Sequence, residues 1–258
     1  MPKFDANLTM LFNEVPFLDR FAAAAAAGFT GVEFLFPYDY EPEALADLLR
    51  ANGLELVLHN LPAGDWAGGE RGIATLPGRQ DEFRASVDTA IRYATALGCP
   101  QVNCLAGIPK GVEPAAARHV FVDNLSYAAP ILADAGIRLL IEAINTRVDI
   151  PGFFLTNTRQ AVEIIEEVGS DNLYFQYDIY HMQIMEGDLA RTIEANLPRI
   201  AHIQLADNPG RNEPGTGEIN YPFLFQFLDR IGYQGWIGCE YKPKGGTADG
   251  LGWLPANA

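Results

Sequence analysis

One unit recurs along the chain: a short apolar run, usually preceded by a glycine, is followed by a loop and a stretch of helical character. Glycine often ends a helix, so a glycine just before an apolar run marks the expected junction between a helix and the next strand. The apolar runs predict eight strands, at residues 3–8, 29–36, 54–59, 101–105, 137–144, 172–178, 200–206 and 235–241. Strands that alternate with helices in this way form parallel βα units.

Eight such units within 258 residues predict a (β/α)8 barrel, or TIM barrel, that takes up residues 1–258 as a single domain. The competing fold is a doubly wound open sheet. That fold often carries a glycine-rich phosphate-binding fingerprint after its first strand, and this chain has none there. The pattern therefore favours the barrel.

The charge balance limits the partners. The chain has 33 acidic and 18 basic residues, a net charge of −15, which repels phosphate backbones and anionic membranes but attracts cations. We therefore expect no nucleic-acid or membrane partner. Its cysteines, Cys99, Cys104 and Cys239, are odd in number and lack CxxC spacing. Together with the lack of a signal-peptide pattern, they predict a cytoplasmic protein without disulfides or structural zinc.

Polar side chains occur late in several predicted strands. Glu142, Asp178, Gln204 and Glu240 hold such positions in the fifth to eighth strands, and catalytic groups of β/α barrels lie at the carboxyl ends of strands. Any one of them alone is compatible with a helix cap or a salt bridge. Several carboxylates at one mouth repel each other unless a cation or shared protons compensate. Four oxygen donors suit a hard divalent ion, so we expect Mg²⁺ or Mn²⁺.

The four histidines are interpreted from their positions relative to the predicted strands. His59 and His181 lie at or just past strand ends and are predicted to face a substrate, with a buried structural role as the alternative. His119 lies on a helical face and is interpreted as structural. His202 lies deeper in its strand, as a core residue or a support for the site. Glu33 is equally compatible with a buried structural acid and is assigned no role.

Two connections are unusually rich in glycine. The segment 62–79 (PAGDWAGGERGIATLPGR) is long and carries Trp66 and Arg71. Long loops inside compact domains are usually functional and often act as lids. The segment 207–221 follows the seventh strand and contains Arg211. For both segments a flexible surface connection is the alternative.

Five segments carry a family resemblance: Val32–Tyr40, Leu58–Ala74, Gln176–Gln183, His202–Tyr221 and Gly238–Pro243. On them, and over residues 7–253 as a whole, the chain resembles the hydroxypyruvate isomerase family of the xylose isomerase-like barrels. The stretch IEAIN stands where that family more usually has IEPIN, a change that leaves Glu142 in place. A sister group that isomerises 2-oxo-tetronates shares GWIGCEYKP and EINYP, whereas LHNLPAGDW, GERG and QYDIYHMQ favour the hydroxypyruvate branch.

The resemblance implies metal ligands at Glu142, Asp178, Gln204 and Glu240, with Glu142 and Glu240 also acting as the proton donor and acceptor. It implies a small 2-oxo-3-hydroxy acid as substrate, with interconversion of hydroxypyruvate and 2-hydroxy-3-oxopropanoate (tartronate semialdehyde). A hydride shift is the alternative to proton transfer. The alternative activities are 2-oxo-tetronate isomerisation and another isomerase or epimerase reaction of the same superfamily.

An anionic substrate in a protein of charge −15 needs a local cation. Arginine suits this task because its guanidinium binds a carboxylate through two parallel hydrogen bonds. The candidates are Arg71, Arg211 and Lys242. Arg71 is preferred because it lies in the glycine-rich loop, with surface pairing to Glu70 or Asp65 as the alternative.

Two other classes of protein are compatible with this barrel. A metal-dependent apurinic endonuclease would need more histidine ligands and a basic groove, which four histidines and the net charge of −15 argue against. A non-catalytic sugar-acid binding protein would have lost a glutamate, but all four expected ligands are present. A homo-oligomer is compatible with the fold, because barrel enzymes commonly associate.

Overall fold

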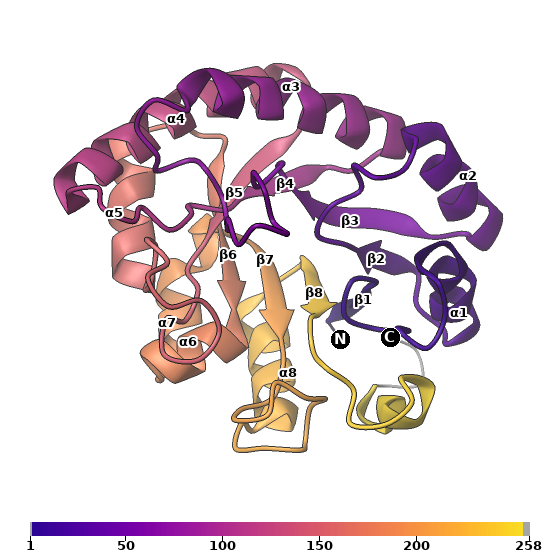
Figure 1. The fold of residues 1–258 in the computed structure, drawn as a ribbon. Helices are drawn as coiled ribbons and strands as arrows, with labels where there is room; N and C mark the ends of the chain where they lie inside the picture. The colour runs from indigo at the N-terminus through magenta and orange to yellow at the C-terminus, as the bar shows by residue number, and fades with distance from the viewer. Residues whose placement is uncertain (1, 255–258) are drawn as a thin grey trace.

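All eight apolar runs form strands in the computed structural model, which describes residues 2–254. The strands are β1 (Lys3–Asn7), β2 (Gly31–Glu33), β3 (Glu55–Asn60), β4 (Gln101–Cys104), β5 (Arg138–Glu142), β6 (Leu173–Asp178), β7 (Ile200–Leu205) and β8 (Trp236–Cys239). Each strand pairs in parallel with the next, and β8 pairs with β1 to close the ring (Figure 1). The predicted TIM barrel is therefore confirmed.

Helices surround the barrel on the outside (Figure 1). They are α1 (Arg20–Ala26), α2 (Pro42–Asn52), α3 (Gln80–Leu97), α4 (Pro114–Asp134), α5 (Thr158–Val168), α6 (Ile179–Met185), α7 (Leu189–Asn196) and α8 (Tyr221–Ile231). Three short 3₁₀ helices cover Phe17–Asp19, Leu197–Arg199 and Ala248–Trp253. As the sequence predicted, glycines end helices ahead of strands: Gly53 closes α2 and Gly98 closes α3, both with left-handed backbone. Within residues 2–254, none of these helices combines the length and apolar character needed to cross a membrane.

The barrel interior is not uniformly apolar. Parallel strands are buried on both faces, and their outer faces pack against the helices in one large hydrophobic core. Polar side chains nevertheless lie buried along the inside of the ring, among them Asp5, Asn7, Glu33, Gln176 and His202. Buried polar groups are costly unless they are hydrogen-bonded, so each of them needs a partner inside the barrel.

The loop after β3 packs tightly on its neighbour. Gly72 has a φ of +114°, and a Cβ there would lie 2.2 Å from the carbonyl oxygen of Leu105, in the loop after β4. A Cβ at Gly107 would lie just as close to the carbonyl oxygen of Gly72. Only glycine permits this contact, so the two loops are held together at the carboxyl end of the barrel.

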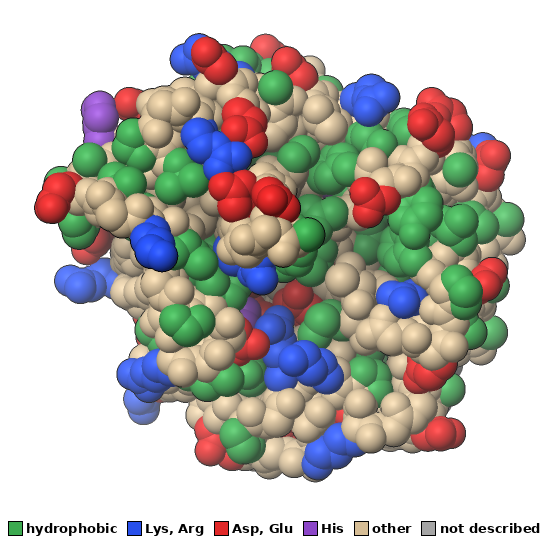
Figure 2. All heavy atoms as spheres, in the orientation of Figure 1, with side chains coloured by type: hydrophobic (Ala, Val, Ile, Leu, Met, Phe, Trp, Pro, Cys, Tyr) green, Lys and Arg blue, Asp and Glu red, His purple; other side chains and the backbone are tan. Residues whose placement is uncertain are grey.

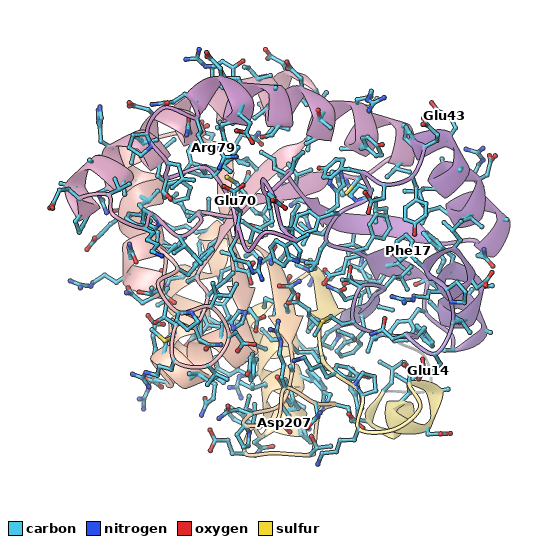
Figure 3. The ribbon with its side chains drawn as sticks, viewed as in Figure 1. Glu14, Phe17, Glu43, Glu70, Arg79 and Asp207 are labelled. Atoms are coloured by element: carbon cyan, nitrogen blue, oxygen red, sulfur yellow. The ribbon has the colours of Figure 1, made fainter. Side chains whose placement is uncertain are left out.

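The loop between β7 and α8 is organised by one carboxylate. Asp207 accepts hydrogen bonds from the backbone N–H groups of Gly215, Gly217 and Ile219, at 2.8, 2.9 and 3.1 Å. Figure 3 shows Asp207 within this loop, below the barrel mouth. A single buried acid therefore sets the course of the segment that carries Arg211.

Candidate active site

A cavity of about 220 Å³ opens at the carboxyl end of the strands. Figure 2 shows a hollow over the middle of this face, with Lys and Arg side chains gathered at its edge and acidic side chains inside it. Seven of the nine site residues expected from the sequence line the cavity: Arg71, Glu142, His181, Gln204, Arg211, Glu240 and Lys242. The other two, Asp178 and His59, are buried beside it or beneath it rather than among the lining residues.

Glu142, Asp178 and His181 form a buried cluster at the cavity. Asp178 ends β6 and its Oδ1 caps α6, accepting hydrogen bonds from the N–H groups of Tyr180 and His181 at 2.7 and 3.1 Å. The Nε2 atom of His181 lies 3.7 Å from Oδ2 of Asp178 and 3.9 Å from Oε1 of Glu142. One ligand atom from each of the three lies within 4.8 Å of the others, a spacing compatible with a metal ion. Asp178 thus serves as helix cap and as cluster member at once.

The protonation of His181 follows from its neighbour Asn145. The Oδ1 atom of Asn145 accepts hydrogen bonds from the N–H groups of Val148 and Asp149, at 3.0 and 3.1 Å. The amide nitrogen of Asn145 must therefore face Nδ1 of His181, 2.7 Å away, and Nδ1 acts as the acceptor. Burial lowers the pKa of His181 to about 4, so the ring is neutral and its one proton is on Nε2. His181 presents a hydrogen-bond donor to the carboxylates, as a substrate-binding group would.

Glu240 follows β8 directly and is tied to Arg211. Its Oε2 lies 3.2 Å from one guanidinium nitrogen of Arg211, and the other terminal nitrogen lies 2.9 Å from Oδ1 of Asp149. The guanidinium also lies over the ring of Tyr180, 5.1 Å from its centroid. Arg211 has a φ of 54°, which residues other than glycine rarely adopt and which is often found at functional sites.

The acids of the cavity resist ionisation. Burial raises the pKa of Glu142 well above its usual value, and the charges of Glu240 and Asp178 raise it further. Burial raises the pKa of Glu240 to about 8, with Arg211 opposing the shift and Asp178 adding to it. Three buried carboxylates with one guanidinium, that of Arg211, beside them form a donor set that a divalent cation would stabilise in the ionised state. The residues present therefore fit a hard metal ion.

The fourth expected ligand, Gln204, is an amide held at both ends. Its Nε2 donates to Oε1 of Glu33 at 2.7 Å, and its Oε1 accepts from Nε2 of Gln176 at 2.6 Å. Gln176 also lines the cavity. Its position two residues before Asp178, on the same face of β6, is the sequence signal that could have assigned it to the site.

Two further polar residues at the site were not predicted. Asn103 in β4 donates from Nδ2 to Oε2 of Glu142 at 3.0 Å, and Asp149 lines the cavity beside Arg211. A late position in the fourth strand was the available signal for Asn103. Asp149 lies in a loop where no spacing rule applies, so the sequence held no comparable signal for it.

Arg71 projects from the loop after β3 without an acidic partner. One guanidinium nitrogen donates to the carbonyl oxygens of Trp66 and Glu70 at 3.0 and 2.7 Å, and the group lies 4.2 Å from the Trp66 ring centroid. The carboxylate of Glu70 pairs instead with Arg79, and Figure 3 shows these two side by side. Among residues 2–254, neither Glu70 nor Asp65 forms an ion pair with Arg71. The guanidinium is therefore held at the cavity wall by neutral groups.

His59 and His202 lie further inside. His59 is buried, with Nδ1 3.0 Å from the carbonyl oxygen of Asn60 and 3.3 Å from the hydroxyl of Tyr38. Burial lowers its pKa to about 4. Its substrate-binding role stays a prediction. His202 lies in the barrel interior with Nε2 2.7 Å from Oε2 of Glu33, as expected of a core or supporting residue.

An eight-stranded parallel barrel with an acidic cavity at the carboxyl ends of its strands defines the protein as a TIM barrel whose candidate active site lies at that end. Residues 21–257 match the model of the xylose isomerase-like TIM barrel, and the chain belongs to this family.

Among its relatives, hydroxypyruvate isomerase of Escherichia coli (strain K12) is 56% identical over 255 residues, 98% of both chains. The 2-oxo-tetronate isomerase of Cupriavidus necator is 51% identical, again over 98% of both chains. A crystal structure from Brucella melitensis, described as an AP endonuclease of family 2, is 49% identical, with a TM-score of 0.97 over 98% of both chains. The resemblance stated from the sequence motifs is thereby confirmed.

Proposed function

We propose that this protein is a hydroxypyruvate isomerase, which interconverts hydroxypyruvate and 2-hydroxy-3-oxopropanoate. The observation that carries the proposal is the pairing of Glu142 and Glu240 in one small cavity, reached from the ends of β5 and β8. The 56% identity to the Escherichia coli hydroxypyruvate isomerase over nearly the whole chain supports the same activity.

The cavity suits a small anion. It measures about 220 Å³, and three cationic side chains, Arg71, Arg211 and Lys242, stand on its wall in a protein of net charge −15. Arg211 is engaged by Glu240 and Asp149, whereas the partners of Arg71 within residues 2–254 are carbonyl oxygens and an aromatic ring. Of the other two cations, Arg71 is the better suited to the substrate carboxylate, because a guanidinium can bind it through two parallel hydrogen bonds and the ammonium of Lys242 cannot.

Four residues would hold the cation: Glu142, Asp178, Gln204 and Glu240. Their donors are oxygens, which favours Mg²⁺ or Mn²⁺. The chemistry that such an ion supplies when bound is polarisation of the substrate's adjacent carbonyl and hydroxyl oxygens. His181 carries its proton on Nε2, so it contributes a hydrogen bond to a substrate oxygen rather than a ligand.

The two glutamates move the proton between carbons. One carboxylate accepts a proton from the hydroxymethyl carbon of hydroxypyruvate, and the C–H electron pair forms the double bond of an enediol. The other glutamate then delivers a proton to the former carbonyl carbon, while the proton of the original hydroxyl passes to the neighbouring oxygen. The net change moves the carbonyl by one carbon, with no oxidant or reductant consumed.

The activity is tested by following equilibration of hydroxypyruvate with the purified protein. The assay is run as purified, after dialysis against a chelator, and after re-addition of Mg²⁺ or Mn²⁺, with a 2-oxo-tetronate in parallel. We expect turnover of hydroxypyruvate that the chelator abolishes and the cation restores. Turnover of the tetronate alone would assign the protein as a 2-oxo-tetronate isomerase. No turnover of either substrate would contradict the proposed isomerase activity.

The second candidate is 2-oxo-tetronate isomerase, favoured by the 51% identity to the Cupriavidus necator enzyme. Nucleic-acid cleavage is disfavoured for this chain, although a structure 49% identical to it is described as an AP endonuclease. The net charge of −15 opposes a polynucleotide, and the three basic residues of the site, Arg71, Arg211 and Lys242, line a cavity of only about 220 Å³.

A further inference from the structure

Glu33 lies at the end of β2, inside the barrel, and does not line the cavity. It is 1% exposed, and both of its carboxylate oxygens are engaged. Oε1 accepts hydrogen bonds from Nδ2 of Asn7 and Nε2 of Gln204, at 2.8 and 2.7 Å. Oε2 lies 2.7 Å from Nε2 of His202. Glu33 is thus the point where three strands of the barrel are joined by hydrogen bonds.

Space for this carboxylate depends on a glycine in β8. A Cβ at Gly238 would lie 2.6 Å from both carboxylate oxygens of Glu33, closer than any unstrained contact. Gly238 also pairs in register with Gln204 of β7. The barrel therefore leaves room for Glu33 to reach the side chain of Gln204, and any larger residue at 238 would push it away.

The two ends of the Gln204 amide differ chemically. The NH₂ end is a donor and the oxygen is an acceptor, and only the oxygen binds a cation. Oε1 of Glu33 already accepts a hydrogen bond from Nδ2 of Asn7 and is therefore an acceptor, so it can pair only with the NH₂ end of the amide. The oxygen is then left to accept from Gln176, and both residues line the cavity. If the amide turned over, two acceptor oxygens would face each other inside the barrel and the nitrogen would face the cation.

We propose that Glu33 is a positioning residue that orients the Gln204 amide so that its oxygen faces the metal site. This inference rests on the proposed cation site, of which Gln204 is a member. The proposal assigns a role to Glu33, a buried acid whose position in its strand did not by itself indicate one. Groups that orient metal ligands typically affect affinity about 10–100-fold when they are removed.

The test is Mn²⁺ binding to cation-free protein, measured by titration calorimetry for wild type, Glu33→Gln, Gln204→Ala and the double variant. Glu33→Gln permits either orientation of the amide, so we expect Mn²⁺ to bind about 10–100-fold more weakly. In the Gln204→Ala background there is no amide to orient, and the same change should alter affinity by less than about threefold. Such a cycle isolates an effect that acts through Gln204.

Asp5→Asn is the matched control. Asp5 belongs to the same buried cluster as Glu33 and His202, but among residues 2–254 it makes no hydrogen bond to Gln204. The control should bind Mn²⁺ within about threefold of wild type. Thermal unfolding of every variant shows whether it is folded. If Glu33→Gln does not fold, Gly238→Ala replaces it, because it keeps the charge of Glu33 and displaces the carboxylate.

Two results would overturn the inference while leaving the cation site intact: Glu33→Gln (or its replacement) binding as tightly as wild type, or an equal loss with and without Gln204. The second result would mean that Glu33 acts through its charge or through the fold. Wild-type protein that binds no Mn²⁺ would overturn the cation site and this inference together.

Discussion

Two buried polar clusters lie within one barrel. The inner cluster is Asp5, Glu33 and His202, and the mouth cluster is Glu142, Asp178 and His181, joined by Glu240. In each, one ligand atom from each of three residues lies within 4.8 Å of the other two. Burial and composition therefore do not distinguish them. What differs is access to the cavity, because Glu33 is enclosed by three side-chain partners whereas Glu142 and Glu240 line the cavity.

Glu33 and Glu240 respond oppositely to burial, although burial and the charge of Glu33 raise the pKa of Asp5, the other acid of the inner cluster, well above its usual value. Burial by itself raises the pKa of Glu33, but His202 and the hydrogen bonds from Gln204 and Asn7 outweigh it and lower the pKa below its usual value. At the mouth, burial dominates, and the pKa of Glu240 rises to about 8. A group whose charge the protein compensates only in part, as Arg211 does for Glu240, is a group that a cation or substrate can complete. The comparison predicts a supporting role for the inner cluster and a reactive role for the mouth.

The largest effect is expected from Glu240→Gln. A positioned acid–base group contributes about 10²–10⁴-fold to turnover, so kcat for hydroxypyruvate should fall by that factor. Because the pKa of Glu240 is already raised by burial, a neutral side chain of the same shape should leave the melting temperature of the cation-free protein close to that of wild type. Steady-state kinetics and thermal unfolding measure the two quantities. A variant that keeps more than about a tenth of wild-type kcat would contradict the assignment.

The next effect concerns metal binding. Asp178→Asn removes a charged ligand but keeps the helix cap, since asparagine caps helices as well as aspartate does. We expect Mn²⁺ affinity to fall about 100-fold, at the upper end of losses seen even for groups that only support a ligand. Glu218→Gln is the control, because Glu218 is a carboxylate bonded to Gln183 and Asn208 and does not belong to the buried cluster of acids. Equal affinities for the two variants would remove Asp178 from the site, and a histidine-rich zinc site in a metal-bound crystal structure would do the same.

A smaller effect is expected at the rim. Arg71→Met should raise KM for hydroxypyruvate about tenfold or more, because it removes a charge-assisted hydrogen bond to the substrate carboxylate. The KM of any neutral ketose that the enzyme accepts should change less. Arg84→Met, on the outer helix α3, controls for loss of a surface charge. If KM for both types of substrate moved equally, the carboxylate would have to be bound elsewhere.

The smallest expected effect is on the pH dependence of stability, through the burial of His59. His59 has a pKa of about 4 in the folded state against about 6.5 when unfolded, so between these values the unfolded chain binds more protons. The free energy of unfolding should therefore fall as pH falls from about 6.5 to about 4. His59→Gln should remove that part of the slope in urea unfolding at several pH values. An unaltered slope in His59→Gln would show that burial alone does not shift this group.

The sequence by itself determined the architecture and most of the site. Apolar runs and the glycines ahead of them are local signals, and all eight predicted strands are present. Their ends were less well predicted: the second was expected over 29–36 and extends over Gly31–Glu33, because its register with β3 shifts between Val32 and Glu33. The rule that strand ends converge also brought Glu142, Gln204 and Glu240 together.

Only the tertiary structure decided which polar groups pair. Arg211 holds Asp149, 62 positions earlier in the chain, and Glu33 holds Gln204, 171 positions later. Glu70 pairs with Arg79 rather than with the adjacent Arg71, and the Arg71 side chain lies at the cavity wall. A pattern of residue types constrains the backbone because strand and helix geometry repeat over a few residues. The choice of a hydrogen-bond or charge partner depends on distance and direction between side chains from distant segments, and the packing of the closed barrel sets both.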